Sequence, residues 1–363
     1  MTDRYRDFRR IAADLGTEAV ALVPGANFTR LFGHEFGTNE RPFVVVIPVE
    51  GAPAAVVPNL ELTGFAALKF EGEVFDWRDQ TGYADSFKAL AAHMPLKSLA
   101  VEGQTMRVFV QLALTGARPA MKIVDGETAI TGLRYCKTPD EIAAMVRAIA
   151  ISEAALGETL DGIRIGQTEK EIERSLVQAM FAHGAEGLAF GALVAAGPHS
   201  AASHAHARDV AIRAGDPLLL DFGARWGGLC ADITRTVFVG HVTDEAAAVY
   251  EVVRAANQRG HDVTRPGVTA HDVDDAVIAV LEASPYADRI RTKTGHGLGR
   301  DVHEAPYIMR GNHQVLEPGV VFTNEPGLYD PRHFGIRIED DVLVTETGSR
   351  SLTSFPKDIR IVG

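Results

Sequence analysis

Cysteine is scarce in this chain: only Cys136 and Cys230 occur among its 363 residues. Two cysteines cannot form the disulfide framework of a small secreted protein, so we expect a reducing compartment, the cytoplasm. Basic residues are also few, with 36 Lys and Arg against 48 Asp and Glu and a net charge of −12. Nucleic-acid binding needs clustered positive charge, and we therefore expect no nucleic-acid partner.

Long apolar runs are missing as well. No stretch approaches the roughly 20 apolar residues of a membrane helix. The first ten residues, MTDRYRDFRR, lack the apolar core of a secretory signal. We therefore expect no membrane partner. A hydrophobic content of 46% and a charged content of 23% are those of an ordinary globular protein. The length predicts about two domains.

Short β-rich runs alternate with helical stretches up to about residue 130. They include AVALVP, PFVVVIPVEG and SLAVEG. This alternation predicts an α/β layer domain over residues 1–132. Its polar residues do not cluster as ligands would, so we expect a structural, oligomerising or substrate-covering role for it.

Two capping boxes indicate helix starts in the second half, residues 133–363. Thr138 with Pro139 and Glu141 predicts one helix, and Thr168 with Glu171 predicts another. Helical spacing predicts the buried residues Ile142, Met145, Val146 and Ile149 in the first helix, and Ile172, Leu176 and Met180 in the second, with Gly184 as its C-cap.

The second half contains two similar segments, GQTEKEI (166–172) and GVTAHDV (267–273). Each lies late in a two-helix segment and is followed by β-rich sequence. The similarity arises either by chance between two capping boxes or from an internal repeat. A repeat would make this half a pseudo-symmetric pair of ααβ units, and sites commonly lie at such interfaces.

Two aspartates, Asp221 and Asp232, interrupt the apolar segment LLLDFGARWGGLCADITRTVFVG. A hairpin centred on Trp226–Gly227 would place them directly opposite each other, with Cβ atoms about 5 Å apart. Two buried carboxylates at that distance repel each other and lose hydration, so we expect a positive charge between them. The alternative is that both lie at exposed strand ends.

Further candidate ligands follow. Glu325 ends an apolar strand, and FGIRIEDDVLVT places Arg337 and Glu339 on one face of a strand. With His296 of GHGLGRDVHEAP they complete a set of four carboxylates and one imidazole. Such an oxygen-rich set favours two bridged divalent ions, which activate water for hydrolysis, over a single zinc ion. We expect Arg337 to neutralise surplus negative charge without binding metal.

These residues resemble the ligand set of the pita-bread metallopeptidases, which include methionine aminopeptidases, aminopeptidase P and prolidase. The matching segments are LDFGARWGGLCADITRTVFVG, GHGLGRDVHEAP, VFTNEPGLYDP and GIRIEDDVLVT. The resemblance extends over residues 133–363. More weakly, residues 1–132 resemble the N-terminal domain of the aminopeptidase P, prolidase and creatinase branch, which methionine aminopeptidases generally lack.

The resemblance implies an α/β fold: an N-terminal creatinase/prolidase-type domain followed by a pseudo-symmetric pita-bread catalytic domain. It implies that Asp221 holds one metal ion and that His296 and Glu325 hold the other, while Asp232 and Glu339 bridge both. We expect Mn²⁺, with Co²⁺ or Zn²⁺ as substitutes. The ions would bring the pKa of a shared water near neutrality.

The resemblance also implies catalytic roles for His204, His303, Glu325 and Arg337. Glu325 would assist as general base, and His303 would contact the substrate or the developing oxyanion. His204 stands where the family usually has Pro-His, although Ser203 replaces the proline here. Two further histidines, His199 and His206, crowd this stretch, so the role can also fall to His206. The alternatives are a structural His303 and a solvated loop around His204.

The expected activity is therefore hydrolysis of Xaa-Pro bonds in short peptides, dipeptides being favoured, by a homodimer. An Xaa-Pro bond lacks the N–H on which ordinary peptidases rely. The alternatives are aminopeptidase P activity, hydrolysis of a non-peptide small amide, and a non-enzymatic binding module. Creatinase lacks the metal ligands and binding modules of this fold typically lose some, which disfavours both, because all five are present here.

Overall fold

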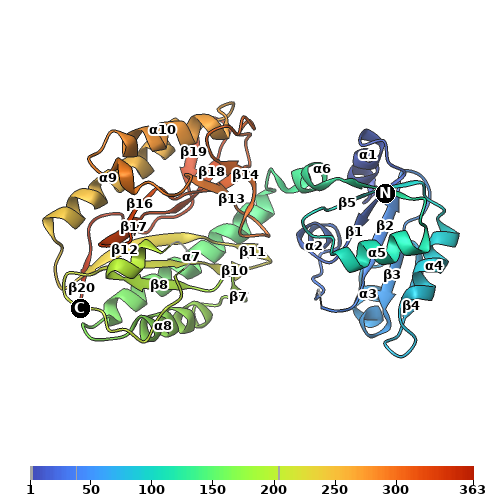
Figure 1. The fold of residues 1–363 in the computed structure, drawn as a ribbon, viewed down its shortest axis with the longest axis horizontal. Coiled ribbons are helices and arrows are strands. Elements are labelled where there is room, and N and C mark those ends of the chain that lie inside the picture. The colour runs from blue at the N-terminus through green and yellow to red at the C-terminus, as the bar shows by residue number, and fades with distance from the viewer. Residues whose placement is uncertain (1–2, 38, 203–204) are drawn as a thin grey trace. The chain divides into compact units, whose positions relative to one another are not determined.

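The computed structural model describes residues 3–37, 39–202 and 205–363. The chain divides into two compact units, Met1–Arg134 and Tyr135–Gly363 (Figure 1). Cys136 and Cys230 are free thiols. Within the described ranges, no helix is both long and apolar enough to cross a membrane. Ser203 and His204 lie outside the described residues.

The first unit is built on one six-stranded sheet. Its strands are β1 (Ala19–Leu22), β2 (Val44–Pro48), β3 (Ala54–Pro58), β4 (Glu73–Trp77), β5 (Ser98–Val101) and β6 (Lys122–Asp125). Their order is β4-β3-β2-β1-β5-β6. Its helices are α1 (Arg6–Asp14), α2 (Ala26–Phe32), η1 (Asn59–Glu61), α3 (Leu62–Ala67), α4 (Ala84–His93), α5 (Val108–Ala117), α6 (Glu127–Thr131) and η2 (Gly132–Arg134).

Both faces of this sheet are buried. Alternate residues along a strand point to opposite faces, and along β1 Val20 packs in one apolar cluster while Ala21 packs in another. The first cluster includes Phe8 of α1 and Phe28 of α2, and the second includes Phe87 of α4. The unit is therefore a helix–sheet–helix sandwich, and the predicted α/β class is confirmed.

The second unit contains two helix pairs. The helices are α7 (Pro139–Gly162), α8 (Glu169–Ala182), α9 (Asp244–Val263) and α10 (Ala270–Glu282), with the short turns η3 (Gly197–Ala201) and η4 (Ala287–Arg289). The first half of this unit contributes strands β7 (Gly187–Leu188), β8 (Leu193–Ala196), β9 (Pro217–Phe222), β10 (Ala224–Trp226), β11 (Leu229–Cys230) and β12 (Ile233–Val239). The second half contributes β13 (Gly295–Gly297), β14 (Glu304–Ile308), β15 (Val321–Asn324), β16 (Gly327–Asp330), β17 (Phe334–Arg337), β18 (Asp340–Val344), β19 (Ser349–Ser351) and β20 (Ile361–Val362).

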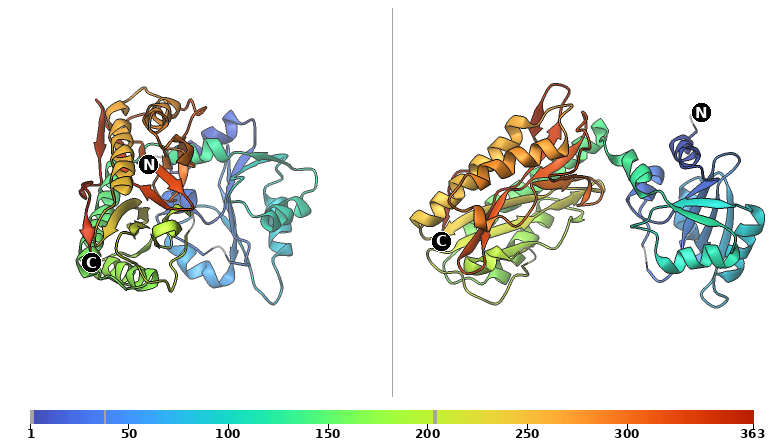
Figure 2. Two further views of the ribbon diagram at one scale, coloured as in Figure 1. Left: turned by 60° about the vertical axis from the view of Figure 1, so that its left-hand side comes forward. Right: turned by 45° about the horizontal axis from the view of Figure 1, so that its top comes forward.

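These strands form four sheets between the helix pairs. Their orders are β20-β12-β9-β8, β11-β10-β7, β14-β13-β15-β18-β19 and β16-β17. One core joins α7 and α8 to β8, β9 and β12, and another joins α9 and α10 to β16 and β17. Each helix pair therefore covers one outer side, with the strands between them (Figures 1 and 2).

Local sequence correctly predicted where the first helix pair begins. The Thr138 hydroxyl accepts a hydrogen bond from the Glu141 N–H, and the Glu141 side chain accepts one from the Thr138 N–H. The same reciprocal box joins Thr168 and Glu171, and Gly184 follows α8 with a φ of 100°. One expectation was wrong: Val146 is 40% exposed, because it lies at the solvent-facing edge of the apolar stripe of α7.

The two similar segments occupy equivalent places. Residues 166–172 open α8 and residues 267–273 open α10, each with a glycine in the left-handed region two residues before the capping threonine. Each helix is the second of its pair and is followed by the strands that its pair covers. The second half of the chain therefore has the pseudo-symmetric αα-then-β layout expected of the pita-bread fold.

Candidate metal centre

The hairpin that carries Asp221 and Asp232 differs from its prediction by one residue at the turn. Strand β9 pairs with β12 so that Asp221 lies opposite Thr234, and Trp226 lies opposite Leu229. The turn is therefore Gly227–Gly228, not Trp226–Gly227. Both glycines have positive φ, 58° and 73°, which the favoured two-residue hairpin turn requires and which tryptophan resists.

The corrected register still brings both aspartates to one face. Asp232 lies two residues before Thr234 and so shares the face on which Thr234 meets Asp221. Gly223 lets the two strands approach closely, because a Cβ there would come within 1.7 Å of the Ala231 carbonyl oxygen. The aspartates are therefore diagonal neighbours instead of a direct pair.

The second half of the unit supplies the other three candidates. His296 lies in β13, Glu325 follows β15 directly, and Glu339 falls between β17 and β18. The single strand expected in FGIRIEDDVLVT is thus interrupted, with Arg337 and Asp340 in different sheets. The interruption matters because the chain passes from one sheet to the other at Glu339.

These five side chains converge in the folded chain. Candidate ligand atoms of Asp221, Asp232 and Glu339 all lie within 4.8 Å of one another, as do those of His296, Glu325 and Glu339. The His296 Nε2 atom is 3.2 Å from Glu325 Oε1 and 3.8 Å from Asp232 Oδ2. Two groups of ligand atoms therefore adjoin, with Glu339 common to both.

Burial dominates the electrostatics of this cluster. It raises the pKa of Asp232 and Glu339 well above their ordinary values, and each is raised further by neighbouring carboxylates. Burial also raises the pKa of Asp221, even though Arg337 opposes the shift. Glu325 differs, because the hydrogen bond and charge of His296 outweigh burial and lower its pKa.

Arg337 is a cation that contacts the cluster. Its Nη2 donates to Asp221 Oδ2 at 2.5 Å, its Nε to Thr234 Oγ1 at 3.0 Å, and its Nη1 to the Tyr329 hydroxyl at 2.9 Å. Burial alone would lower the pKa of Arg337, but Tyr329, Asp221 and the neighbouring glutamates raise it well above its ordinary value. One guanidinium cannot balance four carboxylates.

The donor set fits divalent cations. Asp221 Oδ1 is buried and has no hydrogen-bond partner, although buried carboxylate oxygens normally have one. Each adjoining group offers three ligand atoms close enough to share one ion, and hard oxygen donors suit Mn²⁺ or Mg²⁺. Metal ions would supply the positive charge that the carboxylates lack.

His303 lies beside this cluster. Its ring centroid is 3.8 Å from that of His296 with the planes tilted by 37°, and its nitrogen lies within 4.8 Å of ligand atoms of Asp232 and His296. In contrast to the buried His296, His303 is exposed. The segment GHGLGRDVHEAP is therefore a strand and a turn that bring both imidazoles to one place.

The histidine-rich stretch is only partly described. His206 is exposed and belongs to none of the ligand groups found among the described residues. His199 instead forms a hydrogen bond of 3.1 Å with the buried carboxylate of Glu169. That carboxylate also accepts hydrogen bonds from the backbone and side chain of Arg208. The choice between His204 and His206 therefore stays a prediction.

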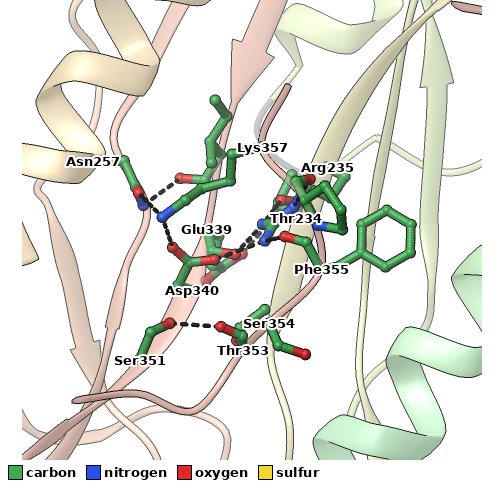
Figure 3. A network of polar contacts seen from close by, with 12 residues as sticks. Thr234, Arg235, Asn257, Glu339, Asp340, Ser351, Thr353, Ser354, Phe355 and Lys357 are labelled. Atoms are coloured by element: carbon green, nitrogen blue, oxygen red, sulfur yellow. Dashed lines mark hydrogen bonds and ion pairs between the residues drawn. The ribbon is translucent and has the colours of Figure 1, made fainter. Parts of the chain in front are cut away.

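A network of polar contacts surrounds Asp340, the residue after Glu339 (Figure 3). Asp340 is 1% exposed and forms ion pairs with Arg235 at 2.8 Å, Lys357 at 2.7 Å and His261 at 2.9 Å. Arg235 also donates to the backbone oxygen of Glu339 at 2.6 Å. The network therefore ties β12, which follows Asp232, to the segment that holds Glu339.

Asn257 of α9 extends this network to Glu325. Its side chain accepts a hydrogen bond from Lys357 Nζ at 2.8 Å and donates to the backbone oxygen of Asn324 at 2.9 Å. The Asn324 amide donates back to the Asn257 backbone oxygen at 2.7 Å. Gly260 leaves the room for this exchange, because a Cβ there would lie 2.6 Å from the Asn324 side chain.

Several residues of the site were missed by the sequence reasoning. Thr234 donates a hydrogen bond to Glu339 Oε2 at 2.5 Å, and Thr323 donates one to Glu325 Oε1 at 3.0 Å. The Tyr329 hydroxyl accepts a hydrogen bond from Arg337. Asp341 is buried and accepts a hydrogen bond from the Asp232 N–H at 3.2 Å. Strand alternation is the signal that could have found the two threonines. Thr234 lies two residues from Asp232 and Thr323 two residues from Glu325, so each threonine points to the same face as its neighbour. No local signal marked Tyr329.

Comparison with known proteins gives consistent relationships over the whole chain. Residues 143–346 match the model of metallopeptidase family M24, and residues 4–136 match the creatinase/prolidase N-terminal domain. A probable dipeptidase, PepE, from Mycobacterium tuberculosis is 34% identical over 96% of this chain and 93% of its own length.

Solved structures agree. Recombinant prolidase from Thermococcus sibiricus superposes with a TM-score of 0.93 at 32% identity, over 100% of both chains. X-Pro aminopeptidase from Thermotoga maritima gives 0.82 at 32% identity, over 97% of this chain and 100% of its own. The family is one of peptidases that use divalent metal ions, and the carboxylate–histidine cluster lies inside the matched residues. This chain belongs to metallopeptidase family M24 and is a peptidase with a creatinase/prolidase N-terminal domain.

Proposed function

We propose that this chain is a dipeptidase that hydrolyses Xaa-Pro bonds in short peptides at a dinuclear metal centre. The observation that carries the proposal is the pair of adjoining ligand groups that have Glu339 in common. Residues 133–363 would form the catalytic domain, and residues 1–132 would form the domain that accompanies it. The named relatives that are prolidases and dipeptidases support the substrate class.

In this proposal each of the five candidate ligands has a defined role. Asp221 would hold one ion and His296 with Glu325 the other, while Asp232 and Glu339 would contact both. Bound divalent ions would supply Lewis acidity and bring the pKa of a water molecule near neutrality. Mn²⁺ is our first choice for so oxygen-rich a set.

The chain's own residues would complete the chemistry. The lowered pKa of Glu325 keeps its carboxylate ionised, the form that a general base needs. Thr323 orients its carboxylate through a hydrogen bond of 3.0 Å. His303, exposed beside the cluster, would donate to the oxygen on which negative charge develops. Arg337 would hold Asp221 in place through its guanidinium.

The substrate assignment rests on chemistry and on relatives. The nitrogen of an Xaa-Pro bond carries no hydrogen, so an enzyme for it must act without that donor. Relatives with this fold include both prolidases and an X-Pro aminopeptidase. Aminopeptidase activity on longer Xaa-Pro peptides is therefore the second candidate.

A substrate panel tests the proposal. Protein loaded with Mn²⁺ is incubated with Ala-Pro, Ala-Pro-Ala, Ala-Ala and small non-peptide amides, and released alanine, or amine from the amides, is measured. We expect Ala-Pro to be cleaved with the highest kcat/KM. Faster cleavage of the tripeptide would favour the aminopeptidase, and turnover of amides alone would contradict the peptide assignment.

The two neighbouring histidines should separate in their effects. His296→Ala is expected to weaken metal binding, because it removes a ligand. His303→Ala should leave the metal bound and lower kcat by about 10²- to 10³-fold, as loss of one transition-state donor commonly does. Calorimetric metal titration together with kcat measures both; a His303→Ala protein whose activity merely follows its metal content would contradict the assignment.

The assembly and compartment are part of the proposal. We propose a homodimer, which light scattering of the purified protein tests directly. Its free thiols, Cys136 and Cys230, agree with a reducing compartment, the cytoplasm.

A further inference from the structure

A buried ion pair adjoins the turn that carries His303. Lys137 Nζ is 2.7 Å from Glu304 Oε1, and each side chain is 2% exposed. Glu304 is the residue immediately after His303. Buried pairs of this kind add little net stability compared with apolar residues, so its role is better sought in geometry.

Both partners of the pair are fixed to the protein interior. The Lys137 N–H donates to the Gly319 oxygen at 2.8 Å, and its Nζ also donates to the Tyr135 oxygen at 3.3 Å. Glu304 begins β14 and pairs with Gly297 of β13, where the register shifts directly after His296. Glu304 is therefore held at the point where the two histidine-bearing segments meet.

Neighbouring glycines make room for this pair. A Cβ at Gly299 would lie 2.6 Å from Glu304 Oε1 and 3.0 Å from Lys137 Cε. A Cβ at Gly297 would lie 2.3 Å from the Ala305 oxygen. Two glycines of GHGLG are thus explained by close packing around the ion pair and the strand, independently of any substrate.

The pair fixes the backbone on which His303 is mounted. His303 itself is exposed, and its ring still stacks on His296 with centroids 3.8 Å apart. An exposed imidazole has several staggered rotamers available, so a defined backbone is needed to keep it over the cluster. The anchored carboxylate of the next residue, Glu304, supplies such a restraint.

We propose that the Lys137–Glu304 ion pair is a positioning device that holds His303 over the metal centre. It acts through His303 and touches neither substrate nor metal. The proposal rests on the role given to His303 above. A displacement near 1 Å at a reacting group can cost about 10²-fold in rate, so the device has a measurable consequence.

A double-mutant cycle tests this directly. Glu304→Gln keeps the shape of the side chain but removes the charge that holds Lys137. We expect it to lower kcat about 10- to 100-fold with KM changed much less and with metal content unchanged. In a His303→Ala protein the same substitution should change kcat less than about 2-fold, because interacting residues are not additive.

Controls separate positioning from general damage. Glu282→Gln breaks a surface ion pair with Arg310 of 2.6 Å and should leave kcat unchanged. Lys137→Arg keeps a cation and should retain more activity than Lys137→Met, which gives a second route if Glu304→Gln folds poorly. Full multiplication of the two effects in the double mutant would overturn the proposal.

The position of the His303 ring tests the positioning role independently of any activity measurement. In a crystal structure of metal-free Glu304→Gln we expect the His303 ring to leave its stack on His296, or to lose its density. A retained centroid separation of 3.8 Å would overturn the proposal. If His303→Ala leaves kcat unchanged, the catalytic role of His303 fails, while the ring geometry still decides the positioning.

Discussion

Asp232→Asn is expected to reduce the metal content from two ions to at most one per chain. Its carboxylate lies in two ligand groups, with Asp221 and Glu339 and with the two histidines. A neutral amide has one carbonyl oxygen and no charge, so it cannot hold two cations together. Loss of several kcal/mol of metal-derived stabilisation corresponds to at least about 10³-fold in kcat/KM.

Elemental analysis of metal-saturated protein, together with Ala-Pro hydrolysis, measures this prediction. The matched control is Asp161→Asn, whose carboxylate forms a surface ion pair with Arg360 at 2.7 Å; it should keep two ions and full activity. At most one ion in the unmodified protein would contradict the dinuclear centre. Two ions in Asp232→Asn would contradict only the bridging role.

Asp340→Asn is expected to destabilise the second unit by about 3–5 kcal/mol at pH 7. The substitution leaves Arg235, which is 2% exposed, without its charged partner, and removing one partner of a buried pair commonly costs this much. Asp209→Asn is the matched control, because its pair with Lys170 is also 2.7 Å long but exposed. The control should cost at most about 1 kcal/mol.

The pH dependence of this effect has a definite sign. Burial raises the pKa of Asp340, but the charges of Arg235 and Lys357 and the hydrogen bond from His261 outweigh burial and hold the pKa well below its usual range. The stabilisation is therefore complete above the unfolded-state pKa of about 4 and is lost as pH falls below it. The difference between unmodified protein and Asp340→Asn should persist at pH 5 and shrink at pH 3.

Tryptophan fluorescence can follow this unit alone. The chain has two tryptophans, Trp77 in the first unit and Trp226 in the second. In a Trp77→Phe background, urea unfolding reports on Trp226. An equal loss of stability at pH 7 and pH 3 would show that the charge of Asp340 is not the cause.

The capping boxes of α7 and α8 were predictable because they are local. Thr138 with Glu141 and Thr168 with Glu171 satisfy backbone groups three residues away, which no distant contact alters. Burial was predictable only for residues at the centre of the apolar stripe of α7. Met145 is fully buried, whereas Val146 is 40% exposed. The width of a buried stripe depends on what packs against it.

The candidate metal ligands could be named from the sequence because charged residues inside apolar strands are costly without a partner and because the segments that carry them resemble a known family. Their arrangement could not be derived in the same way. The hairpin register followed from the positive φ of Gly227 and Gly228, not from the spacing of Asp221 and Asp232. The two aspartates still lie on one face, because residues two apart in a strand point the same way. They are therefore neighbours, although the predicted direct pairing was wrong.

What the sequence by itself determined was the starts of α7 and α8, the α/β class of the first unit and the residue types of the centre. Tertiary structure alone decided the groups that support them. Lys357 contacts Asp340 across 17 residues of sequence and Asn257 across 100, and Lys137 contacts Glu304 across 167. Such pairs leave no periodic trace in the chain, because neither partner's local conformation depends on the other; only the packed fold brings them together.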